Sequence, residues 1–194
     1  MNKFIIATLA MLSLFGGRAM AQRNLPGMSA VEIKGDMVNG FYTGKSRNSG
    51  YDIGVYYSVV KGNNGNTWSF GGEYLQTYKP YGEKGRIPVA QFTAEAGYNL
   101  HLISDYSQTF HLYGGLSALG GYETVNWGKQ VLSDGATLKA KDVFIYGGAL
   151  TLSADFYLSD SFILGAHIKE RCVFGNDTGH FLTQFGVHLK FVID

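Results

Sequence analysis

Four of the five histidines stand where neighbouring segments of the chain could bring them together in pairs. His101 and His111 lie on either side of a short connection, and His167 and His188 flank the turn sequence GNDTG, so that His167 and His188 could be direct cross-strand neighbours. Imidazole nitrogens can bind zinc, transfer protons or hydrogen-bond to one another. Two histidines without a third ligand make an incomplete metal site, so we expect hydrogen-bonded pairs. We predict no metal ion and no other cofactor.

Serine, histidine and an acidic residue could also act together in acyl transfer, because some membrane barrels are lipid-modifying enzymes. The residues to consider are Ser117, Ser153, His111 and Asp155. The alternation described below points all four away from a lipid substrate, and the sequence contains no G-x-S-x-G motif. The glycine-rich stretch GGLSALGG (114–121) lacks the lysine and the following helix of a phosphate-binding loop. We therefore predict no catalytic residues and no enzymatic activity.

The charged residues follow the same alternation. Those that share the polar face of the predicted strands are Glu32, Lys34, Asp36, Glu73, Glu95, Asp155, Lys169, Arg171 and Lys190. A series of such charges could conduct protons or ions, or its members could pair with one another. A charge that has lost its water must be paired, so the simpler prediction is an internal salt-bridge network.

The elements that must position these residues are strands. From Phe185 to Ile193 every second residue is apolar, and a strand places alternate side chains on opposite faces. The same period occurs in residues 31–38, 51–59, 68–78, 89–102, 109–122, 143–158, 161–174 and 181–194. This makes eight predicted strands. Because eight is an even number, both ends of the sheet emerge on the same side, which we expect to be the periplasm.

Alternation alone does not say which face looks inward. In a soluble, lipocalin-like barrel the apolar face would line a ligand cavity, whereas in a membrane barrel it would face lipid. The apolar positions carry one charge, Glu170, and the polar positions are rich in Gly, Ser, Thr, Asn and Tyr rather than the Lys and Glu of a water-facing sheet. Aromatic residues stand at the ends of the apolar runs, at Tyr51, Trp68, Tyr78, Tyr122, Phe144, Phe156 and Phe174. Such girdles are typical of membrane barrels, so we assign the apolar face to lipid.

Composition agrees with an exported membrane barrel. Residues 1–21 contain Lys3, a short apolar run and the sequence AMA, which together predict a cleaved secretory signal peptide before a single domain at 22–194. Loss of Lys3 and Arg18 leaves one more acidic than basic residue, which gives no electrostatic case for nucleic-acid binding. Cys172 is the single cysteine, so no intramolecular disulfide is expected. No later run of 18 apolar residues indicates a membrane-spanning helix.

The predicted fold is therefore an eight-stranded antiparallel up-and-down transmembrane β-barrel whose narrow lumen is packed with side chains. The first, third and fifth connections (39–50, 79–88 and 123–142) are long, whereas 61–67, 102–108 and 158–161 are shorter. Long loops lie outside the cell in such barrels, and loops on a rigid scaffold commonly carry function. The residues in them that could contact a partner are Phe41, Tyr42, Lys45, Arg47, Trp127 and Lys129.

The start of the predicted domain carries a family resemblance. The sequence QRNLPGM (22–28), followed by the first predicted strand AVEIKGDMVNG (30–40), resembles the TraO family of conjugative-transposon transfer proteins from Bacteroides-type bacteria. The resemblance implies a structural or assembly component of a conjugative DNA-transfer apparatus in the outer membrane of a Gram-negative bacterium. It implies outer-membrane lipid and other transfer proteins as partners, with no direct nucleic-acid binding. The alternatives are a stand-alone surface barrel for adhesion or host interaction and a lipid-modifying barrel enzyme.

Overall fold

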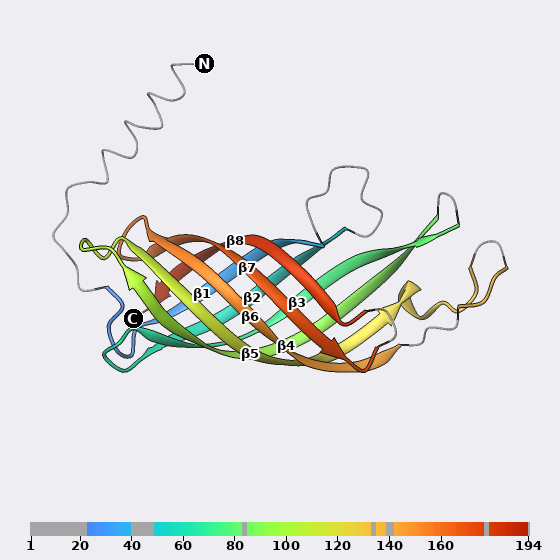
Figure 1. Cartoon of the computed structure of the whole chain (residues 1–194), viewed down its shortest axis with the longest axis horizontal. Coiled ribbons are helices and arrows are strands. Elements are labelled where there is room, and N and C mark those ends of the chain that lie inside the picture. Colours follow the sequence, from blue (N-terminus) through green and yellow to red (C-terminus); the bar gives the residue numbers. More distant parts are fainter. Residues whose placement is uncertain are drawn as a thin grey trace, which may run out of the picture.

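The computed structural model describes residues 23–39, 49–82, 85–132, 135–138, 142–176 and 179–193. Eight strands in these residues form one closed barrel in which each strand pairs with its neighbours in chain order (Figure 1). The strands are β1 (Ser29–Val38), β2 (Gly50–Lys61), β3 (Asn66–Tyr81), β4 (Gly85–Ser104), β5 (Phe110–Val125), β6 (Val143–Tyr157), β7 (Phe162–Phe174) and β8 (Phe181–Ile193). A short 3-10 helix, η1 (Asn126–Gly128), follows β5.

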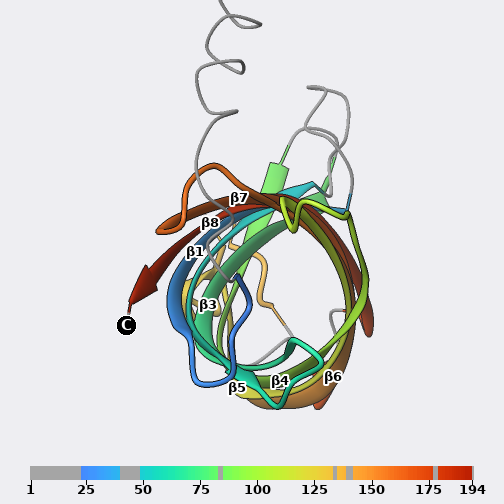
Figure 2. The same cartoon turned by 90° about the vertical axis from the view of Figure 1, so that its left-hand side faces the viewer.

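The first and last strands close the barrel. β1 and β8 pair antiparallel with Val31 opposite Phe191, and every other neighbouring pair is also antiparallel. The view along the barrel shows the resulting closed ring of strands (Figure 2). The predicted eight-stranded, up-and-down antiparallel barrel is confirmed. Among the described residues, no helix is long and apolar enough to cross a membrane.

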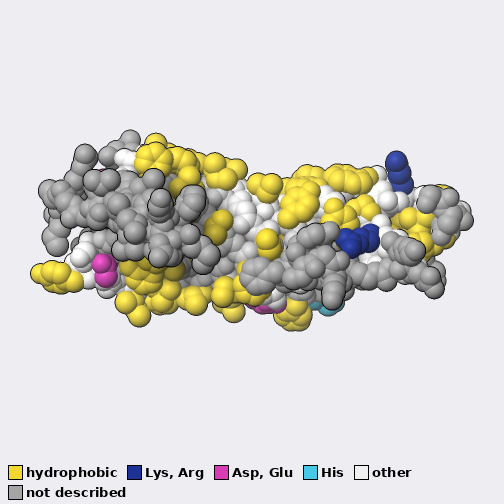
Figure 3. Space-filling model, turned by 90° about the horizontal axis from the view of Figure 1, so that it is seen from above, with side chains coloured by type: hydrophobic (Ala, Val, Ile, Leu, Met, Phe, Trp, Pro, Cys, Tyr) yellow, Lys and Arg dark blue, Asp and Glu magenta, His cyan; other side chains and the backbone are white. Residues whose placement is uncertain are grey.

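The alternating sequence pattern places apolar side chains on the outside of the barrel. Along β2, Ile53 and Val55 are both 55% exposed, whereas Asp52 before them and Tyr56 after them are 1% and 2% exposed. Figure 3 shows hydrophobic side chains along the described barrel wall. The apolar face therefore points outward, as the sequence predicted, and the polar face of the strands points into the interior.

Two barrel ends can be distinguished by their connections. The terminal end holds the start of β1, the end of β8 and the connections 62–65, 105–109 and 158–161. The distal end holds the connections 39–49, 82–84, 126–142 and 175–180.

In the 105–109 turn the Asp105 carboxylate accepts hydrogen bonds from the backbone N–H groups of Phe110 and Thr109, both at 2.7 Å. These bonds, with that of Phe110 foremost, lower the pKa of Asp105.

The predicted long connection at 79–88 is wrong. β3 continues to Tyr81 and β4 begins at Gly85, so the two strands project beyond the barrel as a hairpin with a connection at 82–84. The ladder continues because apolar residues cover it: Ile87, Val89 and Val125 form a buried cluster with Tyr81, Leu132 and Leu138 packed against it. This cluster joins the hairpin to the segment that follows β5.

The interior is not polar throughout. Near the distal end the inward positions become apolar, and Val38, Leu75 and Leu182 form one buried cluster. A second cluster contains Leu119, Ile145, Ala149 and Val173. These strands are therefore apolar on both faces near their distal ends, a change that the alternation did not predict. The two clusters pack apolar side chains into this end of the lumen.

Candidate functional site

The centre of the barrel interior is organised around one buried lysine. Lys169 on β7 is fully buried, and its Nζ atom lies 2.5 Å from Glu73 Oε1 on β3 and 2.5 Å from Glu95 Oε2 on β4. The Tyr56 hydroxyl lies 2.5 Å from the same Glu73 oxygen and 2.9 Å from the same Glu95 oxygen. One cation and one phenol thus satisfy two carboxylates from neighbouring strands, as burial of charge requires.

Arg171 extends this cluster toward the distal end. Its Nη1 atom lies 3.2 Å from Glu73 Oε2 and 3.8 Å from Asp52 Oδ2, and its Nη2 donates to the Thr93 hydroxyl at 3.2 Å. The side-chain amide of Gln184 donates to the same Asp52 oxygen at 3.2 Å. The guanidinium thereby connects β7 to β2, β3 and β4 through the lumen.

A second chain of polar contacts fills the half of the lumen nearer the terminal end. His167 Nε2 lies 3.0 Å from Asp36 Oδ1, and His188 Nε2 lies 2.8 Å from Asp155 Oδ1. Lys190 Nζ lies 2.7 Å from the other Asp155 oxygen and 3.7 Å from Glu32. Lys34 in turn lies 3.5 Å from Glu32.

The two histidines in this chain contact each other through their Nδ1 atoms at 3.2 Å. The prediction that they are direct cross-strand partners is wrong, because His167 pairs with Gly186 and His188 pairs with Gly165. They meet diagonally, since neither glycine has a side chain to separate the rings. One Nδ1 must donate to the other, while both Nε2 atoms face carboxylates.

The residue types of an acyl-transfer site have separate partners in the structure. The Ser117 hydroxyl donates to the Ala149 carbonyl at 3.5 Å. His111 Nδ1 lies 3.2 Å from His101 Nε2, and its Nε2 lies 3.1 Å from the Gln108 carbonyl. Asp155 is held by His188 and Lys190, as described above. These contacts assemble no serine–histidine–acid set, and no group of three metal-ligating side chains occurs in the described ranges.

Both ends of the lumen are closed by side chains. At the terminal end Asn24 donates to the Tyr113 hydroxyl at 3.0 Å and to the Gly65 carbonyl at 3.3 Å. At the distal end Gln91 and Asn176 both donate to the Glu123 carboxylate, at 2.8 and 2.7 Å. Between them lies a cavity of about 60 Å³ bordered by Asn24 and the Glu32–Lys190 contact. A space of this size holds a few water molecules.

The N-terminal segment that closes the terminal end was not predicted from the sequence. Arg23 donates to the Gln108 carbonyl at 3.2 Å and lies 3.5 Å from Asp160, so it joins two turns. Residues 25–28 form a tight turn in which the Met28 N–H donates to the Leu25 carbonyl. Gly27 has a φ of 90°, which with Pro26 before it fits a type II turn. The LPG sequence was the signal that could have predicted this turn.

The distal projection, defined as the β3–β4 hairpin beyond the barrel together with residues 126–132 and 135–138, carries two of the predicted partner-contact residues. Trp127 is 55% exposed, and Lys129 beside it is also exposed. The base of the segment is fixed by Asp142, whose carboxylate accepts from the Thr124 hydroxyl at 3.0 Å and from the Val125 N–H at 3.1 Å. Figure 3 shows Lys and Arg side chains at this end of the molecule. The other predicted contact residues, Phe41, Tyr42, Lys45 and Arg47, lie outside the described residues, as does the predicted signal peptide at 1–21.

The closed eight-stranded barrel, with an apolar wall and a filled, charge-paired interior, is of the outer-membrane β-barrel class. Solved structures with this fold include OprG from Pseudomonas aeruginosa, with a TM-score of 0.57 and 13% identity over 88% of this chain and 99% of that one. Neisserial surface protein A has a TM-score of 0.54 and 11% identity, over 84% of this chain and 96% of that one. Ail of Yersinia pestis, bound to a heparin analogue, has a TM-score of 0.52 and 14% identity, over 87% of this chain and 100% of that one.

The sequence comparison identifies the family. The family model of conjugative transposon protein TraO matches residues 25–193, and the chain belongs to this family. The matched region covers all eight strands and begins in the N-terminal segment that closes the terminal end. A comparison with curated protein sequences finds no match. Membership associates the chain with conjugative transposons.

Proposed function

We propose that this protein is a non-enzymatic structural component of the conjugative DNA-transfer apparatus, embedded in the outer membrane. The observation that carries the proposal is that membership of the TraO family coincides with a filled barrel that bears a folded projection at one end. The barrel anchors the protein in lipid, and the projection provides a surface for other transfer proteins. Proteins of the apparatus, rather than DNA, are its partners.

The filled lumen supports anchoring rather than transport. Lys169, Arg171 and their carboxylate partners cross the interior, and side chains close both ends. The remaining cavity of about 60 Å³ is far smaller than a nucleotide chain requires. Transferred single-stranded DNA would therefore pass through another component.

The proposed orientation places the terminal end in the periplasm and the distal end outside the cell. Its support is the length of the connections, since outer-membrane barrels have short periplasmic turns and longer outer loops. Residues 62–65, 105–109 and 158–161 make short turns at the terminal end, whereas 126–142 is a long connection at the distal end. Residues 1–21 would be removed as a signal peptide during export. Trp127 and Lys129 would then be accessible to partners outside the membrane.

The test is conjugation frequency from a donor with an in-frame deletion of this gene, complemented in trans. We expect the deletion to lower transfer by orders of magnitude and the intact gene to restore it. Surface protease digestion of the complemented donor tests the orientation, because a protease site inserted between Gln130 and Leu132 should be cut in whole cells. Unchanged transfer in the deletion strain would contradict the proposal and favour a stand-alone surface barrel for adhesion.

A further inference from the structure

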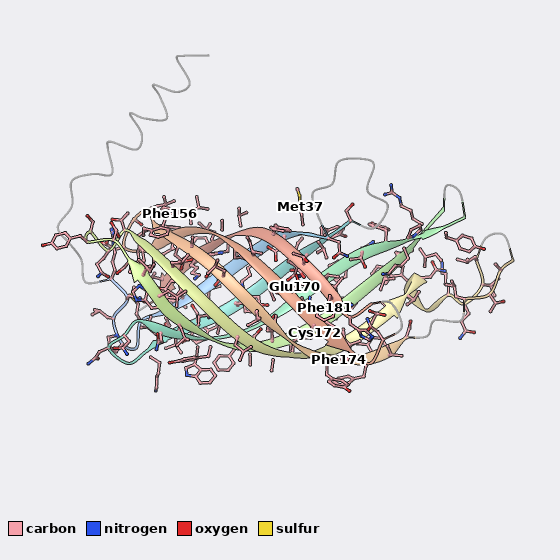
Figure 4. The ribbon with its side chains drawn as sticks, in the orientation of Figure 1. Met37, Phe156, Glu170, Cys172, Phe174 and Phe181 are labelled. Atoms are coloured by element: carbon pink, nitrogen blue, oxygen red, sulfur yellow. The ribbon has the colours of Figure 1, made fainter. Side chains whose placement is uncertain are left out.

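One charged side chain lies on the outer wall of the barrel between the strand ends. Glu170 occupies an outward position of β7, four residues before the end of that strand at Phe174. The Thr183 hydroxyl on β8 donates to its Oε2 atom at 2.6 Å. Figure 4 shows Glu170 along the wall between Phe156 and Phe174. The outward position of Glu170 confirms the prediction that it lies on the apolar face.

The depth of Glu170 places it inside the apolar band. Four residues of strand at about 3.3 Å each, tilted by about 40°, put it roughly 10 Å inward from Phe174, in a band about 25 Å tall. Its outward neighbours are apolar: Leu150 is its partner on β6 and is 64% exposed, and Ile168 on β7 is 49% exposed. A carboxylate facing hydrocarbon is unfavourable, and ionisable groups inside membranes pair with one another.

The barrel itself supplies no counterion to Glu170. In the described part of the chain, no lysine, arginine or histidine lies within ion-pair distance of its carboxylate, and Thr183 is its hydrogen-bond partner. The cations of β7 itself, Lys169 and Arg171, point into the lumen and are fully buried.

A second copy of the chain would not supply a counterion either. Among the described strand residues, the outward basic ones are Lys61 at the terminal end of β2 and Arg86 in the distal hairpin. Copies related by a two-fold axis along the membrane normal meet at equal depth, so neither residue would reach Glu170. A symmetric contact would instead bring two carboxylates together.

We propose that Glu170 and Thr183 form a docking surface for a membrane-embedded segment of a different protein, which brings a lysine or arginine to the Glu170 carboxylate. The occupant is inferred from charge complementarity. A carboxylate and a hydroxyl are unfavourable in hydrocarbon, and a basic side chain on the partner would pair with the carboxylate. The proposal rests on the proposed function in one respect: the partner is a protein of the same transfer apparatus. A membrane contact of this kind would hold the barrel laterally, independently of the distal projection.

The decisive experiment separates barrel stability from DNA transfer. Glu170→Leu removes a lipid-facing charge, so the barrel refolded in phospholipid vesicles should unfold in urea at the same or a higher concentration than wild type. Transfer from a deletion donor complemented with Glu170→Leu should nevertheless fall at least tenfold. Glu170→Gln keeps an acceptor for Thr183 without the charge, and its transfer frequency should also fall. Glu170→Asp keeps the charge and should restore part of the transfer. Phe156→Leu, an apolar change on the same wall near the terminal end, is the control and should transfer normally.

Cys172 provides a second readout, since it is the single cysteine, is free, and faces the same way two residues farther along β7 (Figure 4). A thiol-to-amine cross-linker applied to donor cells should join Cys172 to one other protein encoded by the transfer element. The adduct should disappear in Cys172→Ser and weaken at least tenfold in Glu170→Leu. An adduct of two copies of this chain, or one that is unchanged in Glu170→Leu, would overturn the proposal.

The two proposals fail in different ways. If the gene deletion leaves transfer unchanged, the proposed function is wrong whatever Glu170 does. If the deletion abolishes transfer but Glu170→Leu restores it to the wild-type frequency, the docking surface alone is wrong. Where no adduct forms with the wild-type chain, the transfer frequency of Glu170→Leu decides the question.

Discussion

The Nζ atom of Lys169 on β7 lies 2.5 Å from Oε1 of Glu73 on β3, so one ion pair spans the barrel between strands on opposite walls. The same ammonium group also reaches Glu95 on β4 at 2.5 Å. All three side chains are buried, and the pair joins residues 96 positions apart in the sequence. The contact therefore links the two walls and places a cation between two buried carboxylates.

Replacing Lys169 by methionine should strongly destabilise the barrel. The substitution keeps the side-chain volume but leaves Glu73 and Glu95 without this cation, and breaking a buried pair in this way costs about 3–5 kcal/mol. Urea unfolding in phospholipid vesicles measures the loss. Lys61→Met, at an exposed strand end, is the matched control and should change stability by less than about 0.5 kcal/mol. The double variant Lys169→Met, Glu95→Gln, which keeps Glu73 as the partner of Arg171, should recover most of the loss. Equal stability of Lys169→Met and Lys61→Met would contradict the prediction.

The sequence predicted which side chains face inward but not which of them meet. Alternation assigns a face to each residue because a strand has a period of two, and this was sufficient to place Lys169, Glu73 and Glu95 in the lumen. Their contact depends on the stagger between strands three and four apart in the barrel, which no local pattern encodes. The diagonal contact of His167 and His188 depends instead on the register between the neighbouring strands β7 and β8, which the turn sequence did not fix.

Features made by packing between distant segments were also beyond the sequence. A long connection was predicted at 79–88, yet the hairpin persists because Ile87 and Val89 bury against Val125 from the far end of β5. The closure of the terminal end by Arg23 and Asn24 depends on contacts with turns 41 or more residues away. Only the local part of this closure, the LPG turn, could have been predicted from the sequence.

Two glycines on neighbouring strands should respond differently to alanine. A methyl group on Gly186 would overlap the Asp36 carboxylate, whereas one on Gly35 meets nothing within 4 Å. Gly186→Ala should therefore destabilise the barrel by about 1–3 kcal/mol, as overpacking does. Gly35→Ala should be neutral or slightly stabilising, since alanine restricts the unfolded chain. Urea unfolding compares the two, and a Gly186→Ala barrel as stable as Gly35→Ala would show that the Asp36 side chain can move away.

Asn24 should control opening of the N-terminal segment. Its side chain makes the hydrogen bonds to Tyr113 and Gly65, and its φ of 64° lies in the left-handed region. Asn24→Ala loses both bonds and adds backbone strain, about 1–3 kcal/mol together. Amide hydrogen exchange of the Gly27 N–H, which donates to the Val60 carbonyl, should therefore be about fivefold or more faster in Asn24→Ala than in the wild-type protein.

Asn24→Gly provides the comparison, because glycine adopts a positive φ without strain and loses the side-chain bonds alone. Its Gly27 exchange should fall between those of wild type and Asn24→Ala. The Val173 N–H, bonded to the His180 carbonyl at the distal end, should exchange at the same rate in all three proteins. Faster exchange at both ends would indicate loss of the whole barrel rather than local opening.

Trp127 tests the distal projection as a partner-contact surface. Its side chain is 55% exposed and its backbone is left-handed, with a φ of 54° and a ψ of 39°, so glycine is the substitution that the backbone accepts most easily. Because exposed tryptophans commonly dominate protein interfaces, Trp127→Gly should lower conjugation at least tenfold while leaving urea unfolding unchanged. Tyr106→Ala, which removes an aromatic ring that is 94% exposed at the terminal end, is the matched control. Normal transfer by Trp127→Gly together with reduced transfer by Tyr106→Ala would place the partner contact at the terminal end instead.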